Sequence, residues 1–214
     1  MTHYKSELST VGIEQKFSSR ELLLSPNQET TSVFYLKSGV VRAFMLDFDG
    51  EVITIGYFFP GSTFPTLALF ETPYYSEYFF EARTKVTVQK IESKIFMSFA
   101  EKKDFSKALI ERLSYGIKGL SFRILLLSKT AQVRILLALY YLGKHFSKLG
   151  SENYHFTHQE VAELSGVTRE TVSRVLSSLA KQDIITITDH HIDKINAERI
   201  EDLPILKHIG FNNK

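Results

Sequence analysis

The first half of the chain alternates apolar and polar residues in short runs that turn residues separate. The runs VFYL, VVRAFML, EVITIGYF and KVTVQKI begin at Val33, Val40, Glu51 and Lys85. Asp49 and Gly50 stand between two of these runs, and a tight hairpin turn needs the positive φ that glycine adopts freely. The pattern predicts an antiparallel β-roll, or jelly roll, in the N-terminal half.

The period changes in the middle of the chain, between Phe105 and Ser128. Apolar residues recur there in alternating steps of three and four: Ile110, Leu113, Ile117, Leu120, Ile124 and Leu127. This narrow heptad seam suits parallel pairing with the same helix of a second copy. The alternative is that the stripe packs on its own domain, as the stripes of single helices often do. The seam therefore predicts a dimerisation helix with these six residues in the interface of a homodimer.

A second helix is expected from about Ala131 to Phe146, after a break at SKT that indicates a hinge. The chain is long enough for two modules, each with a core of its own. The predicted fold class is α+β. The expected domains are a β-roll at 1–104, a dimerisation helix and hinge at 105–129, and a C-terminal module at 130–214.

The C-terminal module contains the most specific motif of the chain, which opens with a helix-start signal. Thr157 and Glu160 have the spacing of a capping box, and Phe156 and Val161 are placed for a hydrophobic staple. Gly166 then breaks the helix. Ala162 is a small residue four positions before this glycine. A small residue and a glycine at this spacing are what two steeply crossing helices need, so the spacing indicates a helix-turn-helix.

The second helix of this motif would place Val172 and Val175 on its buried side. Its outward face could read bases, since arginine can pair with guanine and glutamate with cytosine. The alternative is a solvated face with salt bridges. The predicted DNA-binding residues are Thr168, Arg169, Glu170, Thr171, Ser173 and Arg174. The runs DIITIT and HIDKI beyond them predict a two-stranded wing, with His190 and His191 as turn residues.

Composition narrows the function classes. A hydrophobic content of 43% and a charged content of 23% are typical of a globular protein. The longest apolar run, ILLALYYLG, is shorter than the roughly 20 residues of a membrane span, and the N-terminus lacks a signal peptide, so we expect a cytoplasmic protein without a membrane partner. The chain has no cysteine, and no histidine between His3 and His145, so we expect neither a metal nor a cofactor.

The net charge of +2 hides an uneven distribution. Residues 105–150 carry 8 basic and 1 acidic side chains, whereas residues 151–214 carry 7 and 10. Nucleic-acid binding therefore has to rest on local geometry and not on the overall charge.

At these motifs the chain resembles the cyclic-AMP receptor protein and fumarate-nitrate regulator (Crp/Fnr) family of bacterial transcription factors. The resemblance covers about Val33 to Asn196 and is carried by VFYLKSGVVRAF, DGEVITIGYFFPGSTF and TRETVSRVLSSL. It implies a sensory β-roll, a dimerising helix and a C-terminal winged helix-turn-helix that binds a palindromic promoter site.

The resemblance also indicates which nucleotide-binding residues are absent from the β-roll. Pro65 and Thr66 stand where nucleotide-binding members have Gly-Glu for the ribose, and Ser76 and Glu77 where they have Arg-Ser for the phosphate. A phosphate needs an arginine or backbone donors, and Glu77 would repel it. The candidate effector-pocket residues are Phe64, Thr66, Leu67, Tyr75, Ser76, Glu77, Tyr78, Leu120 and Arg123.

The segment PYYSEYFF, Pro73 to Phe80, places five aromatic rings at this pocket. Strand alternation would send rings to both faces, so they cannot all lie in one core. Either they fill the former nucleotide pocket, which we favour, or they line a pocket for an apolar or aromatic effector.

The sequence thus predicts a transcription regulator that is not an enzyme, with promoter DNA, a second copy and RNA polymerase as partners and a small-molecule effector left open. A jelly-roll carrier or enzyme with an incidental helical tail is the alternative.

Overall fold

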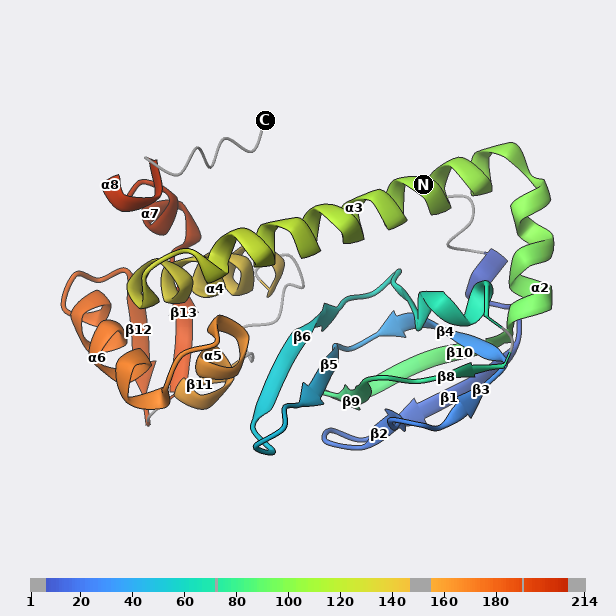
Figure 1. Cartoon of the computed structure of the whole chain (residues 1–214), viewed down its shortest axis with the longest axis horizontal. Coiled ribbons are helices and arrows are strands. Elements are labelled where there is room, and N and C mark those ends of the chain that lie inside the picture. Colours follow the sequence, from blue (N-terminus) through green and yellow to red (C-terminus); the bar gives the residue numbers. More distant parts are fainter. Residues whose placement is uncertain (1–6, 72, 147–154, 190, 208–214) are drawn as a thin grey trace. The chain divides into compact units, whose positions relative to one another are not determined.

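The computed structural model describes residues 7–71, 73–146, 155–189 and 191–207, without the side chains of 112, 115, 118–123 and 125–127. The chain divides into two compact units, Met1–Gly119 and Leu120–Lys214, and helix α3 contributes to both (Figure 1). Each unit is described by itself.

The N-terminal unit is an antiparallel β-roll, as the alternating pattern predicts. One sheet has the strand order β1-β10-β4-β7, a second has β2-β9-β5-β6, and β3 pairs with β8. The strands are β1 Ile13–Phe17, β2 Leu22–Leu24, β3 Glu29–Thr30, β4 Ser32–Ser38, β5 Val41–Leu46, β6 Val52–Phe58, β7 Thr63–Phe64, β8 Tyr74–Tyr75, β9 Phe79–Ala82 and β10 Val86–Glu92.

Strand β4 explains why the VFYL run is continuously apolar, because both of its faces are buried. Phe34 and Leu36 lie in the core between the two large sheets. Val33 and Tyr35 belong to a second core, which includes Phe96 and residues of the neighbouring helical segments. A strand that is covered on both sides cannot show polar alternation.

The hairpin between β5 and β6 is confirmed, but its turn is longer than the two-residue type that Asp49 and Gly50 suggest. Leu46 pairs with Val52, so residues 47–51 form the loop. Gly50 has a φ of +81°, and the Asp47 carboxylate accepts hydrogen bonds from the backbone N–H groups of Asp49 and Glu51, both at 2.9 Å. The Asp47 side chain thus stabilises the longer turn.

Helical segments follow the roll: η1 Thr66–Leu69 between the strands, then α2 Ser93–Ser98, η2 Phe99–Glu101 and α3 Lys103–Leu127. Phe105, near the start of α3, is 5% exposed and packs against Phe96 with ring centroids 5.3 Å apart. The first turns of α3 are therefore anchored to the second core of the roll.

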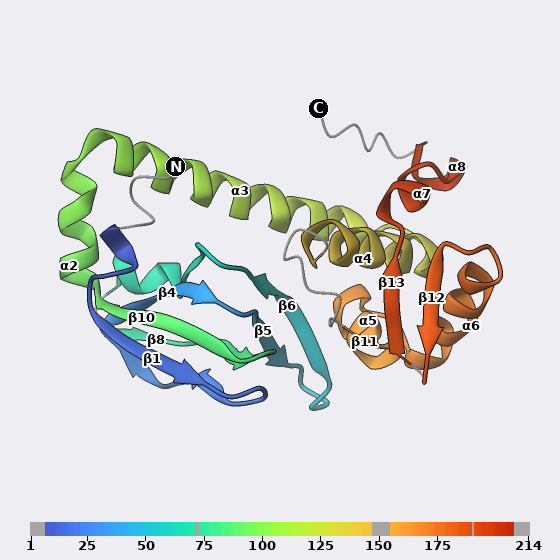
Figure 2. The same ribbon diagram turned by 180° about the vertical axis from the view of Figure 1, so that it is seen from behind.

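The C-terminal unit holds α4 Ala131–Phe146, β11 Phe156–Thr157, α5 His158–Ser165, α6 Arg169–Ala180, β12 Ile185–Thr188, β13 His191–Ile195, α7 Ala197–Glu201 and α8 Pro204–Lys207. Its sheet has the order β11-β13-β12, and Figure 2 shows β12 and β13 side by side. The two predicted wing strands are confirmed, and β11 adds a third that the sequence pattern did not indicate.

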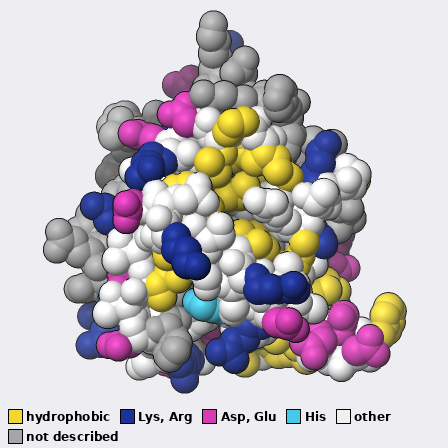
Figure 3. Space-filling model, turned by 90° about the vertical axis from the view of Figure 1, so that its left-hand side faces the viewer, with side chains coloured by type: hydrophobic (Ala, Val, Ile, Leu, Met, Phe, Trp, Pro, Cys, Tyr) yellow, Lys and Arg dark blue, Asp and Glu magenta, His cyan; other side chains and the backbone are white. Residues whose placement is uncertain are grey.

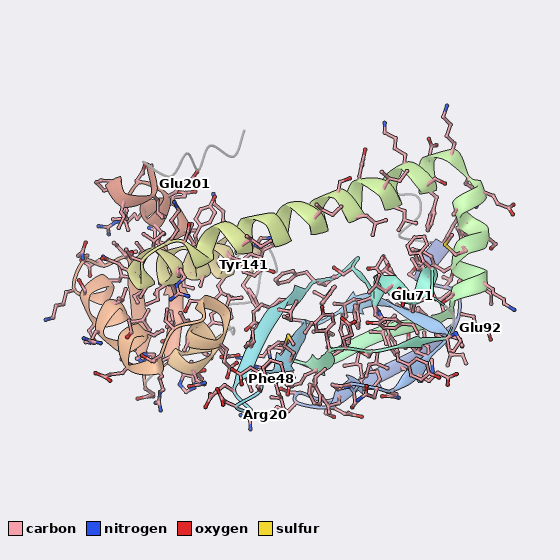
Figure 4. The ribbon with its side chains drawn as sticks, viewed as in Figure 1. Arg20, Phe48, Glu71, Glu92, Tyr141 and Glu201 are labelled. Carbon is pink, nitrogen blue, oxygen red and sulfur yellow. The ribbon has the colours of Figure 1, made fainter. Side chains whose placement is uncertain are left out.

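Helix α7 is tied to α4 by Glu201, which Figure 4 labels. Its carboxylate accepts a hydrogen bond from the Tyr140 hydroxyl at 3.3 Å and lies 3.5 Å from the Lys144 Nζ. Ile200 and Leu206 are 0% and 1% exposed. The described residues 197–207 thus complete the core of the C-terminal unit.

Candidate functional site

The first helix of the helix-turn-helix begins with the predicted capping box. The Thr157 Oγ1 accepts from the Glu160 N–H at 3.1 Å, and the Glu160 carboxylate accepts from the Thr157 N–H at 2.9 Å. Phe156 and Val161, the staple positions, are 3% and 0% exposed. These local contacts fix where α5 starts, and they follow from residue spacing alone.

Gly166 forms the turn between α5 and α6 in the left-handed region, with φ 63° and ψ 42°. Its N–H donates to the Ala162 carbonyl at 2.8 Å. Thr168 then caps α6 by accepting from the Thr171 N–H at 3.3 Å. The turn geometry is therefore set by one glycine and one capping hydroxyl.

We predict that Gly166→Ala lowers the free energy of unfolding by about 1–2 kcal/mol, because a Cβ disfavours the left-handed conformation. The nearest atom to an added Cβ is the Arg134 Nη1 at 3.6 Å, so there is room and the cost is conformational. Urea denaturation of the full chain measures it. Gly166→Asn is the control and should cost less, since asparagine tolerates this region; equal losses would contradict the explanation.

Helix α6 buries Val172, Leu176 and Leu179 and turns its polar residues outward. Arg169, Glu170 and Arg174 are exposed, and Thr171 and Ser173 are half-buried. Val175, which is expected on the buried side together with Val172, is half-buried. The predicted DNA-reading residues thus share one accessible face at the start of α6, with Thr168 as its cap.

Ser173 has a structural role that the sequence did not indicate. Its hydroxyl donates to the Arg169 carbonyl at 3.0 Å and lies 2.8 Å from the Nδ1 of His158 at the start of α5. Because the hydroxyl proton goes to the carbonyl, the His158 Nδ1–H is the donor to Ser173. This pair connects the two helices of the motif.

Two more histidines make hydrogen bonds at or beside the two wing strands. His155 Nδ1 lies 2.5 Å from the Asp193 Oδ1, and the His191 Nδ1 lies 2.9 Å from the Asp189 carbonyl. His191 is the first residue of β13, so the prediction that it is a turn residue is wrong. A hydrogen bond from the Thr188 side chain and the nearby His155 lower the pKa of Asp193. His190 lies outside the described residues.

On helix α3, which the sequence predicts to be a dimerisation helix, three residues of the predicted seam are exposed although they are apolar. Ile110, Ile117 and Ile124 are 63%, 65% and 70% exposed, and they are spaced by seven residues. Leu113 is half-buried. The side chains of Leu120 and Leu127 lie outside the described part. The described isoleucines thus form an unpaired apolar stripe on one side of α3.

Five aromatic residues, which we call the ring cluster, pack together in the core of the β-roll: Phe34, Phe58, Phe64, Tyr78 and Phe80. Phe64 is fully buried, and its ring centroid lies 4.9 Å from that of Phe58 and 5.1 Å from that of Phe80. Phe34 is 5.7 Å from Phe64, and Tyr78 is 6.5 Å from Phe80. Two residues of the PYYSEYFF segment, Tyr78 and Phe80, thus help to fill the interior of the roll.

The remaining rings of that segment go elsewhere. Tyr74 is 3% exposed in the second core, and Phe79 stacks on Phe44 at 4.8 Å, beside Arg42. Tyr75 is 54% exposed and donates a hydrogen bond to Glu29 at 3.1 Å, outside the ring cluster. The rings therefore do divide between faces, as the alternation predicts.

Among the polar candidates of the predicted pocket, Ser76 is held by local hydrogen bonds. The Ser76 hydroxyl donates to the Tyr78 carbonyl at 2.7 Å and accepts from the Tyr78 N–H at 3.2 Å, so it closes a local turn. Glu77 is exposed, and burial and this carboxylate raise the pKa of Tyr78. Thr66 is half-buried and Leu67 is 47% exposed. The side chains of Leu120 and Arg123 lie outside the described residues.

Two further findings concern the described residues only. They include no helix with the length and apolar character that crossing a membrane requires. They also bring together no group of three His, Asp or Glu side chains that could hold a metal ion.

Two family models match the two units. Residues 14–103 match the cyclic nucleotide-binding domain, and residues 133–203 match the Crp-like helix-turn-helix domain. The first match identifies the type of domain. It does not depend on Ser76 and Glu77, which stand where nucleotide-binding members have Arg-Ser.

Similar proteins cover nearly the whole chain. The Anaerobic regulatory protein of Aggregatibacter actinomycetemcomitans is 27% identical over 93% of this chain and 80% of its own length. The cAMP-activated global transcriptional regulator CRP of Pasteurella multocida is 24% identical over 80% of this chain and 84% of its own. A solved CRP/FNR-family transcriptional regulator from Thermus thermophilus has a TM-score of 0.71 and 25% identity, over 89% of this chain and 97% of that one. Together with the β-roll and the capped helix-turn-helix, these matches show that the chain belongs to the Crp/Fnr family of transcription regulators.

Proposed function

We propose that this regulator is a homodimer that binds a palindromic promoter site through α6 and acts on transcription by RNA polymerase. The single observation that carries the proposal is the exposed face of α6, where Arg169, Glu170 and Arg174 project from a helix that is capped and seated as in a helix-turn-helix. Arginine and glutamate on such a face match the donor and acceptor pattern of base edges in the major groove. The stripe of isoleucines on α3 supports the dimer.

A two-fold dimer of this kind should read two half-sites about one helical turn apart, roughly 10 base pairs or slightly more from centre to centre. By resemblance we expect a TGTGA-like or TTGAT-like half-site. Selection of bound sequences from a random DNA library, followed by footprinting, tests this. Enrichment of a single unrepeated site, or of no sequence at all, would contradict the proposal.

We also propose that the protein does not respond to cyclic nucleotides. The ring cluster occupies the interior of the roll, and the Ser76 hydroxyl already donates a hydrogen bond to the Tyr78 carbonyl. Glu77 would repel a phosphate. The PYYSEYFF rings either fill the former nucleotide pocket or line a pocket for an effector. The packing of Phe64, Tyr78 and Phe80 favours the filled pocket, and in that case the dimer binds DNA without a ligand.

Calorimetric titration of the purified protein with cyclic AMP or cyclic GMP should show no saturable heat, because the phosphate has no cationic partner at Ser76 and Glu77. The control is the DNA affinity of the same preparation, which should be high with no small molecule in its mass spectrum. Micromolar binding of either nucleotide would contradict the argument that the chain lacks the residues that bind the cyclic phosphate. DNA binding only after addition of a cell extract would favour an unknown effector.

The filled pocket also predicts that the ring cluster is structural. Phe80→Ala should lower the free energy of unfolding by about 3–5 kcal/mol, as for other buried aromatic residues, and no ligand should restore it. Tyr75→Ala is the matched control from the same segment and should cost at most about 0.5 kcal/mol, since its ring is largely exposed. Urea denaturation of both variants measures the difference. Similar losses would contradict this assignment.

A further inference from the structure

A groove opens on the C-terminal unit between α6, the start of α4 and the segment that enters α8. Its volume is about 460 Å³, which is within the range of pockets that bind small molecules. The described residues that line it are Gln132, Leu136, Arg174, Val175, Ser178, Leu179, Gln182, Leu203, Pro204 and Ile205. Seen from the side of this unit in Figure 3, apolar side chains gather among lysine and arginine side chains.

The floor of the groove is apolar, and so are parts of both walls. Leu136 and Leu179 are 1% and 4% exposed and form a packed floor. Val175 is half-buried, and Ile205 is 36% exposed on the opposite wall. Apolar surface that converges from two helices in this way gains free energy when an apolar group covers it.

The rest of the lining is polar and includes a positive charge. Among the described lining residues none is acidic, and Arg174 is the charged one. Its side chain is 72% exposed, its Nη2 lies 3.9 Å from the Glu170 Oε1, and its bond to the Thr171 Oγ1 is 3.5 Å long. Both distances are at the upper limit of useful contacts, so the guanidinium can still hold an anion with two hydrogen bonds.

We propose that this groove binds a small amphipathic carboxylate, with an aliphatic or aromatic body, and that the ligand weakens DNA binding. The carboxylate accepts hydrogen bonds from the Arg174 guanidinium, and the apolar body covers Val175, Leu203 and Ile205. Binding is noncovalent. The site is separate from the β-roll, so it gives the protein a possible effector response although the ring cluster fills the interior of the roll.

The coupling to DNA follows from Arg174, and this step rests on the proposed function of α6. A guanidinium that is paired with a carboxylate cannot also span the O6 and N7 atoms of guanine. If binding of the two ligands is mutually exclusive, a ligand concentration of ten times its Kd lowers the apparent DNA affinity about tenfold per site.

The direct test uses octanoate as the probe, in calorimetric titration of the full-length protein without DNA. We expect saturable binding with a half-saturation on the order of 0.1–1 mM, and much weaker binding of octylamine, which carries the opposite charge. Arg174→Gln should raise the half-saturation about tenfold or more, whereas Arg169→Gln should leave it unchanged because Arg169 does not line the groove.

A second pair of variants tests the position of the apolar body. Ser178→Phe places a ring in the groove from an exposed position and should abolish octanoate binding. Ser177→Phe, at the exposed neighbouring position that is not among the lining residues, should retain it. Absence of saturable heat up to about 10 mM, equal binding of octylamine, or an unchanged Arg174→Gln variant would overturn the proposal.

The DNA arm is measured separately, by fluorescence anisotropy of a labelled palindromic site with increasing octanoate. Octanoate should weaken the wild-type complex and leave the affinity of the Ser178→Phe variant constant. Octanoate binding without any loss of DNA affinity would refute the regulatory part. Failure of the wild-type protein to bind the palindrome in the absence of octanoate would instead contradict the proposed function and leave the calorimetric result standing.

Discussion

Ile117→Glu is expected to convert the dimer into monomers and to abolish tight binding to a palindromic site. In a parallel seam the two copies of residue 117 face each other, so the substitution buries two like charges without partners. A cost of about 3–5 kcal/mol per uncompensated charge raises the dissociation constant of the dimer by at least about a hundredfold. Light scattering measures the mass, and anisotropy measures the DNA affinity.

The substitution leaves the protomer itself intact, because Ile117 is 65% exposed. The matched control is Glu111→Lys, an exposed position on the same helix outside the seam, which should remain dimeric. A dimeric Ile117→Glu protein with normal DNA affinity would move the interface to another surface and would favour the alternative that the stripe packs on its own domain.

Arg174→Ala is expected to weaken binding to the palindrome by about 1–3 kcal/mol per half-site and to relax the sequence preference at one base position. A bidentate contact between an arginine and a guanine distinguishes that base from the other three, so its loss reduces specificity as well as affinity. Competition titrations against sites that differ at one base pair measure both quantities.

Lys181→Ala is the control for this experiment, since Lys181 is an exposed cation beyond the last residue of α6. It should leave the base preference unchanged, and any loss should be equal on specific and random DNA. An equal loss on both DNAs for Arg174→Ala would mean that Arg174 contacts only the phosphate backbone.

The sequence determines those features that depend on neighbours in the chain. The capping box of Thr157 and Glu160, the left-handed Gly166 and the isoleucine stripe at 110, 117 and 124 are all recognisable from spacing, because each depends on residues at most a few turns apart along the chain. These features suffice to locate the helix-turn-helix and the helix that should pair two copies.

Side-chain partners that are distant in sequence are decided by the tertiary structure. No spacing rule connects His158 with Ser173, or Phe64 with Phe80, and alternation could assign the PYYSEYFF rings to two faces but not to particular neighbours. Tyr75 was a candidate for the pocket, yet the pairing of β3 with β8 turns it toward Glu29.

Sequence patterns also predict the turns and the short terminal helices only in part. Asp49 and Gly50 predict a hairpin, whose Phe48 projects at the loop (Figure 4), but the Asp47 carboxylate sets a longer turn than the pair alone suggests. The helices α7 and α8 have little amphipathic pattern of their own, because each is only one turn or slightly longer. Packing of Ile200 and Leu206 against the C-terminal unit holds them in place. The groove beside Arg174 therefore exists only in the folded protein, since its walls come from segments that are far apart in the chain.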